Sequence, residues 1–213
     1  MDPAFDDRAA AGRALAPLLQ AYAGRPDVVV LALTSGGVPV ACEVARTLAA
    51  PLDVLVVRKL GVPQHPHLAI GAIAGADAVY LDRELLATLV LPQVAIDEAI
   101  AREQVELVRR HAMFCGNRPP LALAGRIAIV VDDGIVTGAS MQVALRALRA
   151  ANPEWIVVAV PVGPDDAADR VGTAADELVC VLGLPDFRNL PQCYRDFSPV
   201  TDEQVRSLLK PPL

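Results

Sequence analysis

Residues 125–149 constrain the fold more than any other part of the chain. This segment reads GRIAIVVDDGIVTGASMQVALRALR. Its five consecutive apolar residues, 127–131, have the length and β-branched content of a strand buried on both faces, and they end at Asp132 and Asp133. A loop of small residues follows, and then apolar residues at the spacing of one helix face, namely Met141, Leu145 and Leu148. The order of strand, acidic end, loop and helix predicts an α/β fold.

The loop between this strand and this helix is a candidate anion site. In an open α/β sheet, ligands bind at the carboxyl edge, where loop amides and a helix N-terminus offer unpaired N–H donors. Glycines let the backbone close around an anion, and hydroxyl groups add donors. The loop residues are Gly134, Ile135, Val136, Thr137, Gly138, Ala139 and Ser140. The alternative interpretation is a helix-capping loop whose polar groups satisfy only the backbone.

A second unit of the same kind lies earlier in the chain. Residues 28–33 read VVVLAL and predict a buried strand, which is followed by Thr34, Ser35, Gly36 and Gly37 and then by a helix. Two such units in one parallel sheet place both loops along the same carboxyl edge. Taken alone, the second loop is equally well interpreted as an ordinary strand-to-helix turn.

Residues 53–57 predict a further strand that ends in Arg58 and Lys59. Arg binds two oxygens of a phosphate at once and Lys acts as a compact point charge, so the pair are candidate ligands for a phosphate. The alternative is two solvated surface charges. The next stretch, 60–80, is rich in Pro, His and Gly and predicts a mobile loop followed by a strand at 78–81.

The remaining pattern alternates between helix and strand, which indicates a parallel, doubly wound sheet. We expect a helix broken at Pro17 near the N-terminus and another over 92–111, and then a strand at 155–160, a short helix at 164–172 and a strand at 177–182. The C-terminal segment gathers aromatic residues, which we expect to seal the core. A capping signal at Thr201 and Gln204 predicts a final helix.

Composition excludes several classes of function. The chain of 213 residues carries 25 acidic and 19 basic residues, for a formal net charge of −6, and has no basic run, so a nucleic-acid partner is not expected. Pro, Gly, Gln and His interrupt the longest uncharged stretch, so no membrane span is expected. Acidic residues near the N-terminus, where a secretory signal would carry basic ones, predict a cytoplasmic protein. The spacing of Cys and His does not favour a zinc site.

The string VVDDGIVTGAS, at 130–140, closely resembles the phosphoribosyl pyrophosphate (PRPP) binding motif of the type I phosphoribosyltransferases. Longer stretches, from DRAAAG to YRDFSPVTDEQV, look like a group of bacterial predicted phosphoribosyltransferases across nearly the whole chain. The resemblance implies the type I fold, a five-stranded, mainly parallel sheet with helices on both faces and a small hood. It implies a single domain over 1–213, with the hood at about 60–80 and a C-terminal segment at 185–213.

The resemblance also implies a reaction, in which a 5-phosphoribosyl group passes from PRPP to a nitrogen base with release of pyrophosphate. The loop amides of 134–140, with Thr137, would hold the 5-phosphate. Asp132 and Asp133 would address the ribose hydroxyls and, through water or PRPP, a Mg²⁺ ion. The pyrophosphate would be bound by a set of five residues: Ser35, Gly36, Gly37, Arg58 and Lys59.

Departures from the family pattern keep alternatives open. The similar bacterial proteins usually read Pro-Arg-Gly-Gly where this chain has Ser35 in the place of the Arg, so a catalytically weak or inactive PRPP- or nucleotide-binding regulatory protein is the main alternative. Val136 stands where oxopurine enzymes carry a carboxylate, which disfavours an oxopurine. A Mg²⁺ phosphohydrolase is a remoter alternative, because the DxDxT pattern is absent. The acceptor base, and the choice between a monomer and a homodimer, stay open.

Overall fold

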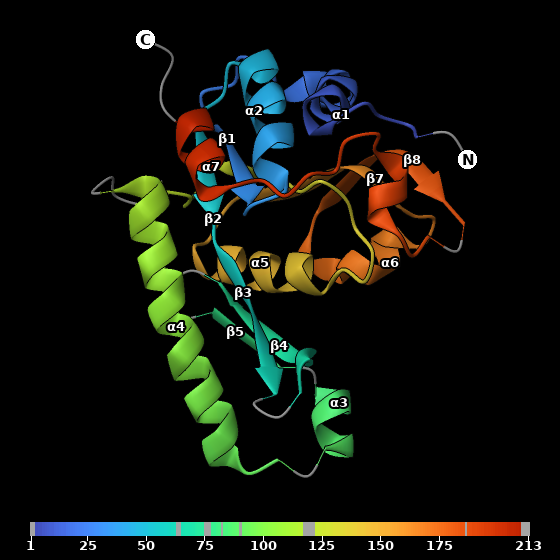
Figure 1. Ribbon diagram of the computed structural model, residues 1–213. Coiled ribbons are helices and arrows are strands. Elements are labelled where there is room, and N and C mark those ends of the chain that lie inside the picture. The colour runs from blue at the N-terminus through green and yellow to red at the C-terminus, as the bar shows by residue number, and fades with distance from the viewer. Residues whose placement is uncertain are drawn as a thin grey trace.

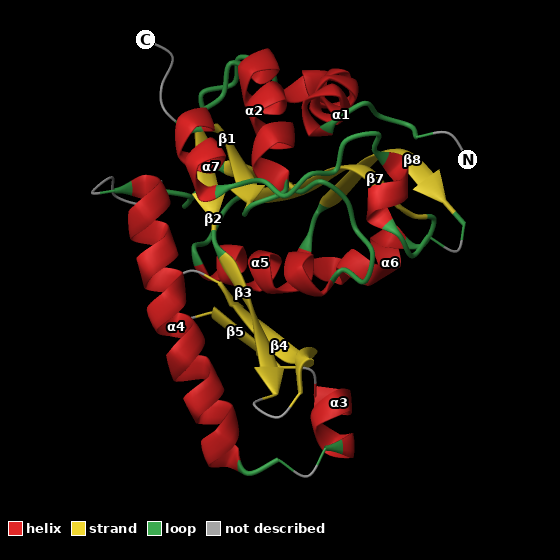
Figure 2. Ribbon diagram, in the orientation of Figure 1, coloured by secondary structure: helices red, strands yellow, loops and turns green. Residues whose placement is uncertain are grey.

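A five-stranded parallel sheet forms the centre of the fold (Figure 2). Its strands are β1 (Val28–Leu33), β2 (Leu52–Leu55), β6 (Ile127–Val131), β7 (Trp155–Pro164) and β8 (Glu177–Leu184). The computed structural model describes residues 3–62, 65–74, 78–81, 83–89, 91–116, 122–185 and 187–209. The strand order is β2-β1-β6-β7-β8, so the chain leaves β1 in one direction and β6 in the other. The crevice between β1 and β6 is therefore the topological switch point, where ligands bind in open α/β sheets.

Helices cover both faces of the sheet, as the sequence predicts for a doubly wound fold (Figure 1). The helices on one face are α1 (Arg8–Leu15), the 3-10 helix η1 (Ala16–Tyr22), α2 (Gly37–Leu48) and α7 (Asp202–Leu208). Those on the other face are α5 (Ala139–Ala150), α6 (Ala167–Val171) and the short η2 (Gly172–Ala174). Alternate residues of β1 point to opposite faces, so Val30 packs in the cluster around α2 and Leu31 in the cluster around α5. This double burial explains the uninterrupted apolar run of the strand.

A second, antiparallel sheet contains β3 (Val57–Val62), β4 (His65–Ala74) and β5 (Ala78–Leu81), in the order β3-β4-β5. It lies below α5 in Figure 1, with α3 (Arg83–Thr88) and the long α4 (Gln93–Cys115) beside it. The strand expected at 78–81 is confirmed. A continuous strand over 53–57 is wrong, because β2 ends at Leu55, and most of the expected loop is strand. The register shifts of the β3–β4 pair interrupt the alternation by which a strand is recognised.

The N-terminal segment runs beside the segment that follows β8. The Phe5 N–H donates to the Cys193 carbonyl oxygen at 3.0 Å, and the Arg195 N–H donates to the Phe5 carbonyl oxygen at 2.9 Å. The connection from β8 includes the 3-10 helix η3 (Leu190–Cys193). Phe187 and Tyr194 are buried together with Phe5, and the half-buried Phe197 packs against them, which confirms that the aromatic residues of the C-terminal segment seal the core. The N-terminal and C-terminal segments are thereby held over the same edge of the sheet.

Local signals at two helix ends behave as the sequence predicts. The break at Pro17 is confirmed, because α1 ends at Leu15 and a 3-10 helix follows. The capping box at Thr201 and Gln204 is confirmed at the start of α7. Within the described part of the chain, no helix has both the length and the apolar content that crossing a bilayer requires.

Candidate functional site

The two predicted loops meet at the crevice between β1 and β6. The strands pair in parallel with Ala32 beside Val131, so both loops leave the sheet at the same level. A Cβ atom on Gly36 would lie 2.2 Å from Asp133 Oδ2, and one on Gly37 would lie 2.5 Å from the Val131 carbonyl oxygen. Only glycine permits this approach of the two loops. The peptide bond between Thr34 and Ser35, just before the contact, is cis.

The loop after β6 keeps backbone donors available. The Ile135 N–H donates to the Val162 carbonyl oxygen at 3.0 Å, which fixes the loop to β7. The N–H groups of Gly134, Val136 and Gly138 make no backbone hydrogen bond within the described parts of the chain. Gly138 has φ +79°, a left-handed conformation that suits glycine, and α5 begins at the next residue. N–H groups that are not used by the backbone, at the start of a twelve-residue helix, can donate hydrogen bonds to an anion.

Arg170 on α6 contacts this loop and was not predicted as a site residue. Its Nη1 group donates to the Val136 carbonyl oxygen, and its own carbonyl oxygen accepts a hydrogen bond of 2.7 Å from Gln142 Nε2. Asp166 pairs with the guanidinium at 2.8 Å. A Cβ on Gly138 would lie 3.1 Å from the Arg170 carbonyl oxygen. Arg170 thus braces the loop from the α6 side, a role for which the sequence gives no signal.

The two acidic residues at the end of β6 have different surroundings. Asp132 is half-buried, and its Oδ1 atom accepts a hydrogen bond of 2.9 Å from the Asp133 N–H. Burial of the carboxyl group and the negative charge of Asp133 raise the pKa of Asp132 well above its usual range. Asp133 is only 8% exposed. The half-buried Asp132 is therefore the more accessible of the two carboxylates.

Arg8 holds Asp133 in place. Its Nε donates to Asp133 Oδ2 at 2.8 Å, and its Nη1 donates to the Ser198 carbonyl oxygen at 2.8 Å. The guanidinium carbon lies 3.8 Å from the centre of the Phe197 ring, a cation–π contact. The Tyr194 hydroxyl donates to the Asp133 carbonyl oxygen at 2.6 Å, and burial raises the pKa of this tyrosine. Helix α1 and the C-terminal segment thus fix one acid of the candidate site.

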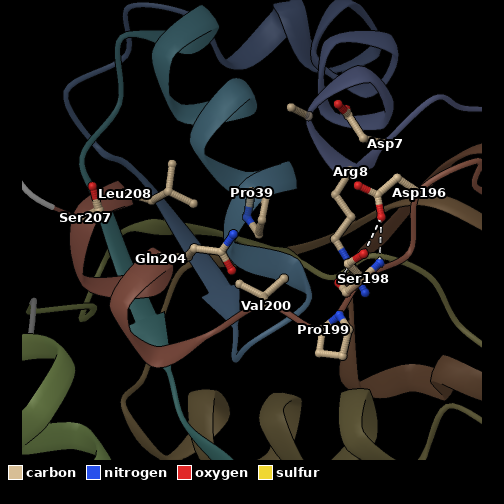
Figure 3. A pocket seen from close by; sticks show the side chains of 11 residues that line it. Asp7, Arg8, Pro39, Asp196, Ser198, Pro199, Val200, Gln204, Ser207 and Leu208 are labelled. Atoms are coloured by element: carbon tan, nitrogen blue, oxygen red, sulfur yellow. Dashed lines mark hydrogen bonds between the residues drawn. The ribbon is translucent and has the colours of Figure 1, made fainter.

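A cavity of about 360 Å³ lies beside Arg8, between α1, α2, α7 and the segment that connects η3 to α7 (Figure 3). Asp196 lines it and accepts hydrogen bonds from the N–H and hydroxyl of Ser198, at 2.9 and 2.6 Å. A second cavity, of about 600 Å³, lies beyond the end of β8, where Phe187, Arg188 and Asn189 contribute to its wall. The segment after β8 therefore lines both cavities.

The two predicted cations, Arg58 and Lys59, lie in β3 and not at the carboxyl end of a strand of the central sheet. Arg58 forms an ion pair with Glu103 on α4, with Nη2 2.8 Å from Oε2, and Lys59 is exposed. Among the described residues, no side-chain hydrogen bond or ion pair joins either residue to the Ser35 loop. Their role in binding pyrophosphate stays a prediction.

The described residues contain no group of three or more His, Cys, Asp or Glu side chains arranged to hold a metal ion. Mg²⁺ binds proteins through one or two carboxylates and takes its other ligands from water and substrate phosphates. The half-buried Asp132, beside the second acid, fits this kind of site. A metal there would depend on the oxygens of a bound substrate.

Comparisons with known proteins agree with this geometry. The sequence profile described as "Phosphoribosyl transferase domain" matches residues 6–187. A Mycobacterium tuberculosis protein, named provisionally as a phosphoribosyl transferase, is 46% identical over 205 residues, which are 96% of this chain and 46% of that protein. The chain therefore spans a little under half the length of this curated relative.

A crystal structure from Thermus thermophilus, of the protein TT1426, superposes on this chain with a TM-score of 0.77. The two sequences are 40% identical, and the match covers 98% of each chain. The similarity therefore includes the central sheet, the small antiparallel sheet and the C-terminal segment.

Proposed function

The chain belongs to the phosphoribosyl transferase domain family, and on this premise we propose that it transfers a 5-phosphoribosyl group from PRPP to a nitrogen base. The reaction breaks the bond between the ribose C1 atom and pyrophosphate and forms a bond from C1 to the nitrogen. The observation that carries the proposal is the contact of Gly36 with Asp133, which joins two glycine-containing loops at the switch point of the sheet.

We assign the 5-phosphate to the loop 134–140. The amides of Gly134, Val136 and Gly138, which make no backbone hydrogen bond within the described residues, and the start of α5 support this assignment. The hydroxyl of Thr137, which is exposed, would add a donor. Arg170, which contacts the Val136 carbonyl oxygen from α6, would keep the loop in the shape that the phosphate requires. Holding the phosphate fixes the sugar relative to the base.

We assign the ribose hydroxyls to the acids. Positive charge develops on the ribose ring as pyrophosphate leaves, and a carboxylate beside the ring stabilises it. Asp132 would contact the hydroxyls and would help to hold Mg²⁺, which would supply positive charge near the departing pyrophosphate. Asp133, which is buried against Arg8, would hold the loop in place and keep it in contact with Gly36. The two acids thus divide the roles that the sequence assigns to both.

We assign the pyrophosphate to the loop formed by Ser35, Gly36 and Gly37, whose place beside Asp132 and Asp133 supports this role. Arg58 and Lys59 follow β2 in the chain, and Arg58 would contribute to this group only if its ion pair with Glu103 opens. Closure of a loop or hood over the substrate is a usual device for excluding water.

The cavity of about 600 Å³ beyond β8 is the place that we propose for the nitrogen base. Asn189 and Gln192 contribute to its lining, and Leu190, which lies between them in the chain, packs against Gly134. A base in this cavity would be next to the loop that holds the sugar phosphate. Apolar walls with a few polar groups are typical of small-molecule sites.

The experiment that tests the function is a pyrophosphate-release assay with PRPP, MgCl₂ and a panel of purine, pyrimidine and pyridine bases. The proposal predicts release of pyrophosphate that requires both Mg²⁺ and one class of base. An Asp132→Asn variant, assayed in parallel, should lose this release. Absence of release with every base, together with PRPP binding by calorimetry, would instead support a binding protein.

That second candidate function, a PRPP- or nucleotide-binding regulatory protein, is favoured by two observations. Ser35 stands where an Arg is usual, and Arg58 is engaged by Glu103. Both reduce the positive charge available to a leaving pyrophosphate, which matters more for turnover than for binding. Substituting Ser35→Arg separates the two functions, because only an enzyme limited by this missing charge would gain activity.

A further inference from the structure

Three polar side chains on the wall of the 600 Å³ cavity make no hydrogen bond or ion pair with the described residues. These are Arg188, Asn189 and Gln192, which lie close together in the segment after β8 and are exposed to solvent. Other arginines of the described chain, such as Arg170 and Arg195, each form an ion pair with an aspartate. The N–H donors of the Arg188 guanidinium are therefore available to a ligand in the cavity.

The charge of this wall is positive. Among the described residues that line the cavity, Arg188 is the only charged one. Burial raises the pKa of the Cys193 thiol and of the Tyr194 hydroxyl, so these two lining groups stay protonated near neutral pH. The smaller cavity beside Arg8 differs, because Asp7 and Asp196 line it. Of the two cavities, the larger one is therefore suited to an anionic ligand.

Asp165 is an acid that approaches the same end of β8, but from the other face of the strand. A Cβ atom on Gly183 would lie 2.9 Å from Asp165 Oδ1, so Asp165 lies on the face to which Gly183 points. Leu182 and Leu184, the neighbours of Gly183, line the cavity. Because successive strand residues point to opposite faces, Asp165 is on the opposite face of β8 from the cavity.

The rest of the cavity wall is mostly apolar and suits a flat ring. Leu182, Leu184 and Phe187 contribute to it, and its volume is typical of a site for a small molecule. Leu190, in the same segment as Arg188, packs against Gly134 of the proposed phosphate loop. The ligand that matches both parts of the wall is a ring with one anionic substituent, held beside the sugar phosphate.

We propose that the acceptor base is a nitrogen heterocycle that carries a carboxylate, and that Arg188 binds this carboxylate. A guanidinium and a carboxylate match in geometry, because two parallel N–H groups donate to the two oxygens. The amides of Asn189 and Gln192 would bind polar atoms at the edge of the ring. This inference rests on the proposed function and specifies the class of acceptor.

The carboxylate takes no part in the bond changes of the transfer. The lone pair of the ring nitrogen forms the bond to ribose C1, and the bond from C1 to the pyrophosphate oxygen breaks. The electron pair of the broken bond leaves on pyrophosphate. An acceptor with a ring N–H releases that proton to solvent, whereas a pyridine nitrogen has no proton to lose and becomes cationic. Arg188 is therefore a residue that selects and positions the acceptor.

Matched pairs of bases test the selection of the carboxylate. Nicotinate differs from nicotinamide, and orotate from uracil, by the presence of the carboxylate. With PRPP and MgCl₂, we expect pyrophosphate release in which kcat/KM for the acid of at least one pair exceeds that for its neutral partner by about tenfold or more. Equal or greater kcat/KM for the neutral base in both pairs would overturn the inference.

Substitutions of Arg188 test whether this residue binds the base. Arg188→Gln should raise KM for the acidic base by about tenfold and leave KM for PRPP unchanged. Arg188→Lys keeps the charge without the two-pronged geometry, so we expect a smaller rise. Arg206→Gln removes the same charge at an exposed position of α7 and should leave both constants unchanged. Circular dichroism verifies that the variants stay folded.

Calorimetric titration of the bases, with and without PRPP, separates this inference from the proposed function. Arg188-dependent binding of the acid without release of pyrophosphate would support the carboxylate site and contradict the transfer reaction. Release with neutral bases alone would support the transfer and overturn the inference. An Arg188→Gln variant in which KM rises only for PRPP would assign Arg188 to a phosphate and would also overturn it. Neither binding nor release with any base would overturn both.

Discussion

The guanidinium of Arg8 and the carboxylate of Asp133 form a buried ion pair, with Nε 2.8 Å from Oδ2 and side-chain exposures of 10% and 11%. Arg8 also donates to the Ser198 carbonyl oxygen, so one side chain of α1 connects the end of β6 with the C-terminal segment. Gly36 contacts the same carboxylate from the other loop. The pair therefore joins the parts of the chain from which the candidate site is built.

Removing Arg8 should destabilise the protein strongly. Arg8→Gln would leave the Asp133 carboxylate buried without its partner, which costs about 3 kcal/mol of unfolding free energy. Urea denaturation measures this loss. The control is Arg13→Gln, because Arg13 lies 3.6 Å from Glu43 with its side chain 58% exposed, and an exposed pair contributes less than about 1 kcal/mol. Equal losses in the two variants would show that the Arg8 pair adds no particular stability.

Adding a methyl group at Gly36 should disrupt the contact between the two loops. The new Cβ in Gly36→Ala would lie 2.2 Å from Asp133 Oδ2, so the loops must separate. We expect weaker PRPP binding, by about tenfold or more, and a lower unfolding midpoint. Gly163→Ala is the matched control, since its nearest neighbour would lie at 3.4 Å, an ordinary contact. PRPP affinity equal to that of the wild type in Gly36→Ala would refute the loop contact as part of the site.

The central sheet was predictable because its strands are buried on both faces. The apolar runs of β1 and β6 end at the residues that the sequence predicts. The acidic pair and the small-residue loop after β6 indicate where that strand ends and the next helix begins. Such signals are local, so a single sequence carries them. The same holds for the capping box at Thr201, whose two hydrogen bonds join residues three apart.

The parts that were not predictable depend on contacts between distant residues. Arg8 and Asp133 are 125 positions apart, and the local pattern around Arg8 does not show that its side chain reaches the end of β6. The antiparallel sheet was missed for a different reason, because its glycines, prolines and shifted register hide the strand pattern of β4. The position of Arg58 was not predicted for the same reason, since this residue lies in β3 and pairs with Glu103 on α4.

The stability of the protein should fall at alkaline pH partly through Tyr194. Burial raises the pKa of this tyrosine above the value of 10.0 that it has when exposed, so the unfolded chain ionises first. The contribution of Tyr194 is therefore constant below pH 10 and is lost as the pH rises further, by about 1 kcal/mol at pH 10.5. Urea denaturation at pH 8 and 10.5 measures the change.

The Tyr194→Phe variant separates the contribution of Tyr194 to this loss of stability from the contributions of other titratable groups. At pH 8 the variant should be less stable by about 1 kcal/mol, because the Asp133 carbonyl oxygen loses its donor, and this difference should shrink at pH 10.5. Tyr22 remains as an internal reference, since burial and the hydrogen bond to Glu177 raise its pKa to about 12. A difference that is the same at both pH values would contradict the account.

Restoring the usual cation at position 35 should strengthen PRPP binding. Ser35→Arg adds a guanidinium beside the proposed pyrophosphate site, and charge-assisted hydrogen bonds to phosphate should raise the affinity by about tenfold. Thr47→Arg, at an exposed position of α2, controls for the change in net charge. Pyrophosphate release that also rises in Ser35→Arg would favour an enzyme, and an affinity that falls would remove this loop from the pyrophosphate site.

The most direct test of the site is calorimetric titration of the wild type and of Asp132→Asn with PRPP and Mg²⁺. Asp132 is half-buried and close to Asp133, so removing its charge should not lower the free energy of unfolding. The account predicts binding by the wild type and at least tenfold weaker binding, by roughly 1.4 kcal/mol or more, by the variant. A wild type that does not bind PRPP, or equal affinity in the two proteins, would contradict it.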